Sequence, residues 1–364
     1  MTAVSLRPGG TMAVCVLLLA ASLGLSSCSQ GKPAAPGHTR TETASPAGRT
    51  GGAAPGGGSS SGAGGRGPSV AATGPLPAPA ALMPFRGPAV AGAGTWRPAG
   101  RPAGGARAVY ETTLIPPGGT QAAGISWMDT RVLSARLYSG SKSPGGGPYR
   151  YTAPIAPAQA RTLVAAFNGG FQTKDAHGGY YTEGRMVAPL RPGAASLVIS
   201  ADGGVTVGAW GRDVTMTRNV VSVRQNLVPL VAAGQPTPQA MSGDWQAWGS
   251  TCGATSCLHS VPGIEHQWRS GIGVTADGAL VYVTGPALDP LQLAQLLVRA
   301  GVIRGMQLDI NPAWTVFVSY DPAGGGPAAP SNGSKLLAAT TQGPWTFFQS
   351  WWARDFITMS ARSG

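Results

Sequence analysis

The segment "LDPLQLAQLLVRAGVIRGMQLDIN", residues 288–311, predicts a helix that is followed at once by a strand. Asp289 is a typical N-cap residue, and leucines recur behind it at helical spacing until Gly301 ends the pattern. The next residues, 302–310, have the length and composition of a buried strand. The helix is therefore expected to pack on a sheet, and the strand to carry Asp309 to its end.

Two further segments predict β-hairpins, because each places Asp-Gly between alternating β-branched runs. They are "SLVISADGGVTVG", residues 196–208, and "GIGVTADGALVYV", residues 271–283. Asp202 and Asp277 are then turn residues, which removes them from the catalytic candidates. A second helix is predicted over "APAQARTLVAAF", residues 156–167. Hairpins with few helices indicate an α+β fold, with a mixed β-sheet core and a few flanking helices.

The chain has 364 residues, including 56 Gly and 32 Pro, and much of this Gly and Pro lies early. Residues 31–84 have almost no aromatic or β-branched side chains and cannot bury enough apolar surface to offset their ordering entropy. We therefore expect a signal peptide over residues 1–27, a disordered tether over residues 28–95 and one folded domain over residues 96–364.

The first residues resemble a bacterial lipoprotein signal. Arg7 precedes the apolar run "TMAVCVLLLAASLGL", which is short for a transmembrane helix, and "LSSC" follows directly. Cleavage before Cys28 and lipidation of its sulfur are expected to leave the protein exported and anchored to the outer face of the cell membrane. An ordinary signal peptide with a chance cysteine is the alternative, and it also implies export.

Four cysteines are present, and only Cys252 and Cys257 lie in the part expected to fold. In an exported protein, a pair this close most simply forms a disulfide. The alternative is a zinc site that adds His259 and His266, although the spacing matches no familiar zinc finger.

The net charge of +12 does not by itself indicate a nucleic-acid partner. The Lys and Arg residues are scattered and never form a run with interleaved aromatic residues, as a nucleic-acid groove would favour. We therefore expect no nucleic-acid binding.

No standard catalytic motif is present: the sequence lacks a G-x-S-x-G elbow, a Walker loop and an H-E-x-x-H pair. A Ser-His-Asp mechanism would have to use His177, His259 or His266, and none of these has a nucleophile motif nearby.

Carboxylates in polar turns are the more informative candidates, because the chain has only 14 acidic residues. Glu183, Asp213, Asp244 and Asp309 stand out in this way. Carboxylates are expected wherever a glycosidic bond is cleaved. The alternative for each of them is a helix cap or an ion pair.

Taken together, "AAFNGGF", "YYTEGRMVAPL", "WRSGIGVTADGALVYV", "LAQLLVRAGVIRGMQLDIN" and "RDFITM" resemble the phosphodiester glycosidase family in order and spacing. This family includes the lysosomal uncovering enzyme, which removes N-acetylglucosamine from a sugar phosphodiester. The resemblance spans residues 109–359 and implies a single phosphodiester glycosidase-like domain that acts on a glycan or sugar phosphodiester.

The resemblance also implies a site. Asp309 matches the family's strand-end aspartate and would act as general base or nucleophile, with Glu183 as the other carboxylate. Arg269 matches an arginine at a strand start and would hold the departing phosphate, because a guanidinium fork fits phosphate oxygens. His266 would supply a proton or simply pack. The expected substrate-binding residues are Asn168, Gly169, Gly170, Arg185 and Asn311.

One departure from the family concerns the residues after Asp309, where Ile310 and Asn311 replace two glycines. A close backbone approach and a positive φ become doubtful there. The sequence therefore leaves three readings open. The first is a hydrolase that cleaves a sugar-1-phosphodiester in cell-envelope glycans or related sugar phosphates, and the second is a glycan-binding protein without catalysis. The third is a different hydrolase or a purely structural envelope protein. The binding reading would use aromatic rings to stack on sugars. These are Tyr180, Tyr181, Trp245, Trp248 and Trp314.

No cofactor is assigned, and a requirement for a divalent cation is left open.

Overall fold

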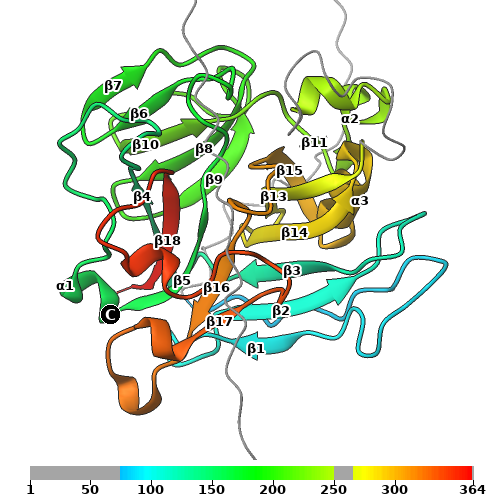
Figure 1. Ribbon diagram of the computed structural model, residues 1–364, viewed down its shortest axis with the longest axis horizontal. Coiled ribbons are helices and arrows are strands. Elements are labelled where there is room, and N and C mark those ends of the chain that lie inside the picture. The colour runs from blue at the N-terminus through cyan, green and yellow to red at the C-terminus, as the bar shows by residue number, and fades with distance from the viewer. Residues whose placement is uncertain (1–73, 250–264, 363–364) are drawn as a thin grey trace, which may run out of the picture. The chain divides into compact units, whose positions relative to one another are not determined.

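Antiparallel strands in three sheets make up most of the structure, a computed structural model that describes residues 74–249 and 265–362 (Figure 1). The chain divides into two units, Met1–Ser69 and Val70–Gly364, and the fold concerns the second. Cys28, Cys252, Cys257 and His259 lie outside the described residues, so lipidation, the disulfide and the zinc alternative stay predictions.

The largest sheet has eight strands, all paired antiparallel. In spatial order they are β1 (Arg97–Ala99), β2 (Val109–Leu114), β3 (Ala123–Met128), β14 (Leu280–Leu288), β13 (Gln267–Thr275), β15 (Val302–Gln307), β11 (Val231–Ala232) and β12 (Gln235–Pro236).

Two five-stranded sheets complete the fold, again with antiparallel pairs only. One runs β7 (Arg185–Ala188), β6 (Tyr180–Thr182), β10 (Val220–Gln225), β8 (Ala195–Ser200) and β9 (Val205–Ala209). The other runs β17 (Gly333–Lys335), β16 (Phe317–Tyr320), β5 (Leu163–Asn168), β18 (Phe356–Ala361) and β4 (Leu133–Tyr138). The expected mixed sheet is thus wrong for the described residues.

Helices are few and mostly one turn long. The α-helices are α1 (Pro157–Ala160), α2 (Pro238–Met241) and α3 (Pro290–Arg299), and the 3-10 helices are η1 (Trp245–Trp248), η2 (Ala323–Gly325), η3 (Pro330–Asn332) and η4 (Thr346–Phe348). No helix in the described ranges has the length and hydrophobicity needed to cross a membrane.

The three elements with the clearest sequence patterns form as predicted. Asp289 caps α3 in a capping box with Gln292, and β15 follows the helix directly. The hairpins β8–β9 and β13–β14 form around the two Asp-Gly turns. These elements are local, so short-range periodicity and turn chemistry are sufficient to specify them.

The predicted helix over residues 156–167 is wrong in its second half. Only α1 is helical, and the chain then enters β5, whose six residues are all buried. β5 pairs with both β16 and β18. Because this strand lies inside a sheet, an apolar run that could have formed a helix is instead extended by its tertiary partners.

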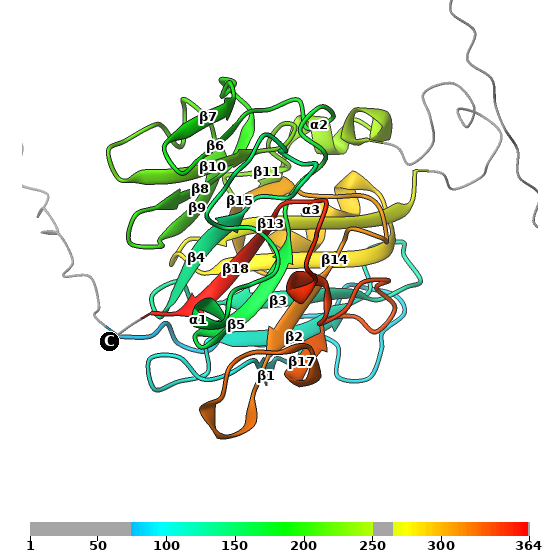
Figure 2. The same cartoon turned by 60° about the vertical axis from the view of Figure 1, so that its left-hand side comes forward.

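The central core lies where the three sheets pack together, and it draws side chains from all of them. Figure 2 shows these sheets from a second direction, with β5 and β18 next to one another. Strand β14 shows the expected alternation: Leu280 and Tyr282 enter this core, whereas Val281 and Val283 pack with α3 on the other face. The sheet is therefore buried on both faces.

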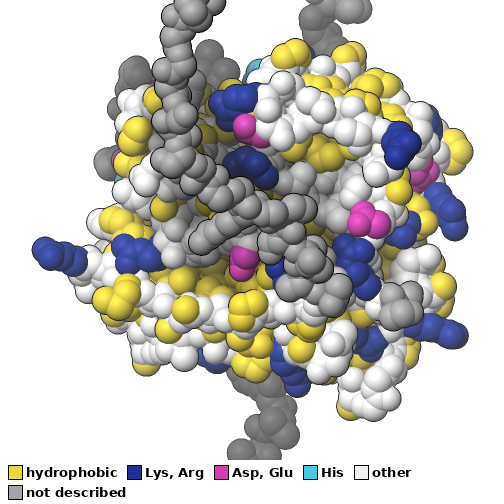
Figure 3. All heavy atoms as spheres, turned by 180° about the vertical axis from the view of Figure 1, so that it is seen from behind, with side chains coloured by type: hydrophobic (Ala, Val, Ile, Leu, Met, Phe, Trp, Pro, Cys, Tyr) yellow, Lys and Arg dark blue, Asp and Glu magenta, His cyan; other side chains and the backbone are white. Residues whose placement is uncertain are grey.

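Lys and Arg side chains are spread over the face opposite to that of Figure 1 and do not gather there into one patch (Figure 3). This view is consistent with the scattered basic residues of the sequence.

Candidate functional site

Five polar or charged side chains meet where strands of different sheets end. Strand β5 ends at Asn168, Asn226 follows the end of β10, Asp309 lies two residues beyond β15, and the pair before β18 completes the group. All are buried. We call this group the strand-end cluster: Asn168, Asn226, Asp309, Arg354 and Asp355.

Asp309 is held by donors on both carboxylate oxygens. Its Oδ1 accepts the backbone N–H groups of Ile310 at 2.8 Å and Asn311 at 3.3 Å, and its Oδ2 accepts a hydrogen bond from Arg354. Burial raises the pKa of Asp309 to about 6, and the attraction of Arg354 and the backbone N–H groups only partly opposes this. A carboxylate with such a pKa is suited to accept a proton near neutral pH.

The guanidinium of Arg354 has more N–H donors than the described residues use. Its Nη2 serves Asp309 and the carbonyl of Gly170, the latter at 3.0 Å, and its guanidinium lies 5.0 Å from the ring centroid of Trp314. Its buried Nε has no hydrogen-bond partner among the described residues. Buried donors are normally paired, so the unpaired Nε, which solvent does not reach, is unusual.

Asp355 forms a second buried ion pair with Arg224, with 2.6 Å between Oδ2 and Nε. The guanidinium of Arg224 also donates to the carbonyls of Gln225 and Phe171. The strand-end cluster and Arg224 thus contain two carboxylates and two guanidinium groups, so the buried charges balance.

The two asparagines fix the N-G-G-F turn, residues 168–171, to its neighbours. Asn226 accepts from the N–H of Phe171 and donates to the carbonyls of Gln307 and Leu308. Asn168 accepts from Tyr282 Oη at 2.7 Å and donates to Ser270 Oγ at 3.1 Å, with its other polar contacts to backbone. Asn168 therefore has structural partners on both amide atoms.

The glycines of the turn are required by close packing. A Cβ on Gly169 would lie 2.3 Å from Asp355 Oδ2, and a Cβ on Gly170 would lie 2.7 Å from Asn226 Oδ1. The N–H of Gly169 donates to the carbonyl of Asp355, whereas the N–H of Gly170 has no partner within the described ranges. Of these two expected substrate-binding residues, only Gly170 therefore has a backbone N–H without a partner in the described part of the chain.

Arg269, the expected phosphate-binding residue, is fully buried and its nitrogens are occupied. It donates to the carbonyls of Leu288, Trp248 and Glu265 and to the side chain of Gln307. Burial lowers its pKa to about 10. Arg269 therefore fastens the segments around β13, and its nitrogens are already engaged by protein acceptors.

Glu183 and Arg185 lie in and just after the β6–β7 turn, and the structure does not bring them into contact with Asp309. The Glu183 carboxylate accepts the N–H groups of Arg150 and Tyr151 at 2.9 and 3.1 Å. Arg185 donates to the carbonyls of Pro148 and Gly146. Both side chains fasten one loop to this hairpin. The second carboxylate of the strand-end cluster is Asp355 instead of Glu183.

His266 and Asn311 also have local contacts. His266 lies 3.2 Å from a carboxylate oxygen of Glu265 and 3.8 Å from one of Asp289, the cap of α3. Asn311 Oδ1 accepts the N–H of Ala313 and shapes the turn after Asp309. Neither Ile310 nor Asn311 has a positive φ, so this turn avoids the conformation that the family's glycines would allow.

The aromatic candidates differ in access to solvent. Tyr180 and Trp248 are buried, whereas Tyr181, Trp245 and Trp314 are partly exposed. Of these three, Trp314 adjoins the strand-end cluster through Arg354. Within residues 74–249 and 265–362, no three His, Cys, Asp or Glu side chains are placed to hold a metal ion.

Three residues around Asp309 were missed at the sequence level. Arg354 and Asp355 begin the quoted motif "RDFITM", but no role was given to them, and Arg224 lies in no motif at all. Two opposite charges directly before a buried strand are a usable signal for the first two. Arg224 has no local signal, because its partner Asp355 is 131 residues away.

The fold and the strand-end cluster define a mostly β protein with a buried carboxylate–guanidinium site. Residues 161–309 match the model of the phosphodiester glycosidase family, so this stretch carries a domain of that family, as the sequence motifs predicted. The match ends at Asp309, and Arg354 and Asp355 lie beyond it.

Solved structures show more distant similarity. The zebrafish N-acetylglucosamine-1-phosphodiester alpha-N-acetylglucosaminidase catalytic domain, auto-inhibited by its pro-peptide, is 16% identical, with 70% of this chain and 82% of that chain covered and a TM-score of 0.41. A hypothetical protein from Synechocystis is 11% identical, with 71% and 63% covered and a TM-score of 0.38. No curated protein sequence matches this chain.

Proposed function

We propose that the chain is a hydrolase that cleaves the bond between a sugar's anomeric carbon and a phosphodiester oxygen. The observation that carries this proposal is the buried pair of Asp309 and Arg354, in which the Arg354 guanidinium has a nitrogen without a hydrogen-bond partner in the described part of the chain. The pair combines a carboxylate that can take up a proton with a fixed cation that can hold a phosphate. The phosphodiester glycosidase domain supports this assignment.

In the proposed reaction, Asp309 takes a proton from a water molecule whose oxygen attacks the anomeric carbon. The bond from that carbon to the phosphate oxygen breaks, and its electron pair stays on the phosphate. The products are a free sugar and a phosphomonoester. Arg354 stabilises the charge that gathers on the phosphate, as fixed donors do in other transition states. Because phosphate leaves readily as an anion, a strong general acid is not required.

The direct test is release of free sugar by the purified full-length protein from N-acetylglucosamine-1-phosphodiesters and from a nucleotide sugar. Because Asp309 must be ionised to act as a base, we expect kcat/KM to fall tenfold per pH unit well below the Asp309 pKa of about 6 and to level off above it. The phosphodiester stays ionised throughout this range. A flat profile between pH 5 and 8 would contradict this role for Asp309.

The same assay tests Arg354. Arg354→Lys keeps the positive charge but loses the planar fork, so it should raise KM or lower kcat, whereas Arg218→Gln, at an exposed turn, should change neither.

A second candidate function is glycan binding without hydrolysis. It is favoured by the surroundings of Asp309, whose side chain is 4% exposed and already accepts three hydrogen bonds. It is also favoured by the buried Ile310, which stands in place of a glycine. In that case the protein would bind the same sugars without releasing product, and binding would survive Asp309→Asn.

We also propose export and anchoring through a lipid on Cys28. This proposal rests on the sequence alone, on the basic residue, apolar run and cysteine in that order. Fatty-acid labelling of the protein in a bacterial host should be lost in Cys28→Ser and kept in Cys15→Ser. Equal labelling of both variants would count against it.

A further inference from the structure

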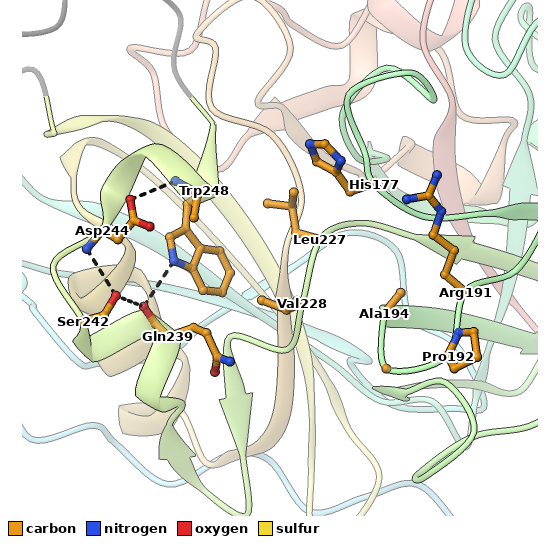
Figure 4. Close-up of a pocket in the computed structure, with 12 residues that line it drawn as sticks. His177, Arg191, Pro192, Ala194, Leu227, Val228, Gln239, Ser242, Asp244 and Trp248 are labelled. Carbon is orange, nitrogen blue, oxygen red and sulfur yellow. Dashed lines mark hydrogen bonds between the residues drawn. The ribbon is translucent and has the colours of Figure 1, made fainter. Parts of the chain in front are cut away.

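A cleft of about 450 Å³, whose lining does not include Asp309, lies between the segment that holds α2 and η1 and the turn that precedes β8 (Figure 4). Its volume is within the range of small-molecule sites. The side chains that line it include His177, Arg191, Leu227, Gln239, Asp244 and Trp248. The hydrolysis proposed at Asp309 uses none of these side chains.

Two nitrogen-bearing side chains on one side of the cleft have no partner in the described part of the chain. They are Arg191 and His177, which Figure 4 places opposite Asp244 and Trp248. The backbone of Arg191 is anchored, because its N–H donates to Gln225 Oε1 at 2.8 Å and its carbonyl accepts from Gln225 Nε2 at 3.2 Å. The guanidinium is exposed to solvent and extends from this anchored backbone without a hydrogen-bond partner among the described residues.

The opposite side of the cleft carries polar side chains on a segment that is held by its own hydrogen bonds. The indole N–H of Trp248 donates to the carbonyl of Gln239, and Asp244 Oδ1 accepts the N–H of Ala247. The remaining carboxylate oxygen of Asp244 and the side-chain amide of Gln239 have no partners among residues 74–249 and 265–362. These groups can accept from and donate to hydroxyl groups.

The backbone around the cleft is in an unfavourable conformation at two points. His177 and Leu227 have φ of 49° and 56°, and they are two of only five non-glycine residues with positive φ in the described part of the chain. The N–H of Leu227 donates to the carbonyl of Ala176 at 2.7 Å, so the two positions are coupled. Such conformations cluster at ligand sites, where the surrounding structure maintains them.

We propose that this cleft binds a hydroxyl-rich anion, namely a sugar that carries a phosphate or a carboxylate group. Arg191, with His177 beside it, pairs with the anionic group through charge-assisted hydrogen bonds. Asp244 and Gln239 bind hydroxyl groups on the opposite side, and Leu227 contacts the apolar face of the ring. The inference does not depend on hydrolysis at Asp309, because it concerns binding by a separate set of residues.

The test is calorimetric titration of the full-length protein with glucose 1-phosphate, and with glucuronate as the carboxylate probe. Arg191→Gln should weaken binding of one or both probes about tenfold or more, as expected when a charge-assisted hydrogen bond is lost. Arg218→Gln is the matched control, since it removes an exposed arginine outside the cleft and should leave binding unchanged. The probe that responds identifies the anionic group.

The probes could also bind at the strand-end cluster, so the titrations are repeated in Arg354→Gln. Binding at the cleft should persist in this variant and should still weaken when Arg191→Gln is added. Unchanged binding in Arg191→Gln would overturn the proposal. So would inorganic phosphate that binds as tightly as glucose 1-phosphate, because the hydroxyl contacts would then contribute nothing. Glucose alone should bind weakly. His177→Asn, which keeps a residue that tolerates positive φ, should reduce affinity without unfolding the protein.

Discussion

Asp309→Asn is expected to lower kcat for release of sugar from a sugar-1-phosphodiester by roughly 10²–10⁴-fold, the usual contribution of a general base. The amide can still accept a hydrogen bond from Arg354, but it cannot take a proton from water. Binding of the substrate should change much less than kcat. Steady-state kinetics of the full-length protein, with substrate binding measured in parallel, give both values.

The matched control is Asp321→Asn. Asp321 also pairs with an arginine, Arg107, at 3.0 Å, but its side chain is 52% exposed, so the exchange should leave kcat unchanged. If Asp309→Asn retained wild-type kcat on a hydrolysed substrate, Asp309 would not be the base. If neither protein released sugar while both bound it, the glycan-binding function would replace hydrolysis.

Asp355→Asn is expected to destabilise the protein by about 3–5 kcal/mol, because it leaves the charge of Arg224 buried without a counter-charge. The side chains of Arg224 and Asp355 are 1% and 0% exposed, so water cannot take over the lost interaction. The backbone carbonyl of Asp355 also accepts the N–H of Gly169, and we expect this hydrogen bond to weaken as the start of β18 loosens. Equilibrium urea unfolding at neutral pH measures the loss.

Asp213→Asn is the comparison for this change. Asp213 pairs with Arg212 at the surface at 2.9 Å, and such pairs contribute about 0–1 kcal/mol. Equal destabilisation by the two exchanges would mean that the buried pair has no special contribution. It would also mean that the ion pair of Arg224 and Asp355 does not hold the N-G-G-F turn in place.

Local patterns allowed much of the fold to be predicted. The cap at Asp289, the leucine spacing of α3 and the two Asp-Gly turns each act over a few residues, and all formed as expected. Strand β5 was not predicted, because its extended form depends on β16 and β18, which follow it much later in the chain. An apolar run of that length fits either a helix or a strand.

The candidate site shows the same limit. The position of Asp309 just beyond a strand could be predicted, since helix, strand and carboxylate are consecutive. Its partner Arg354 could not, because 45 residues separate them and pairing over that distance has no sequence pattern. Glu183 shows the opposite error: it lies in a motif of the family, yet its hairpin directs the carboxylate to a neighbouring loop.

Because β18 lies between β5 and β4, the strand-end cluster is complete only after β18 has been synthesised. Two strands made early leave a gap in their sheet that only this late strand fills, and the two residues before it bring the counter-charges for Asp309 and Arg224. A nascent chain that has not yet produced β18 therefore has an open sheet and two unmatched charges. The hydrolysis proposed at Asp309 would therefore require a strand that is synthesised after the family motif, and a chain that stops before β18 would carry the motif without a complete strand-end cluster.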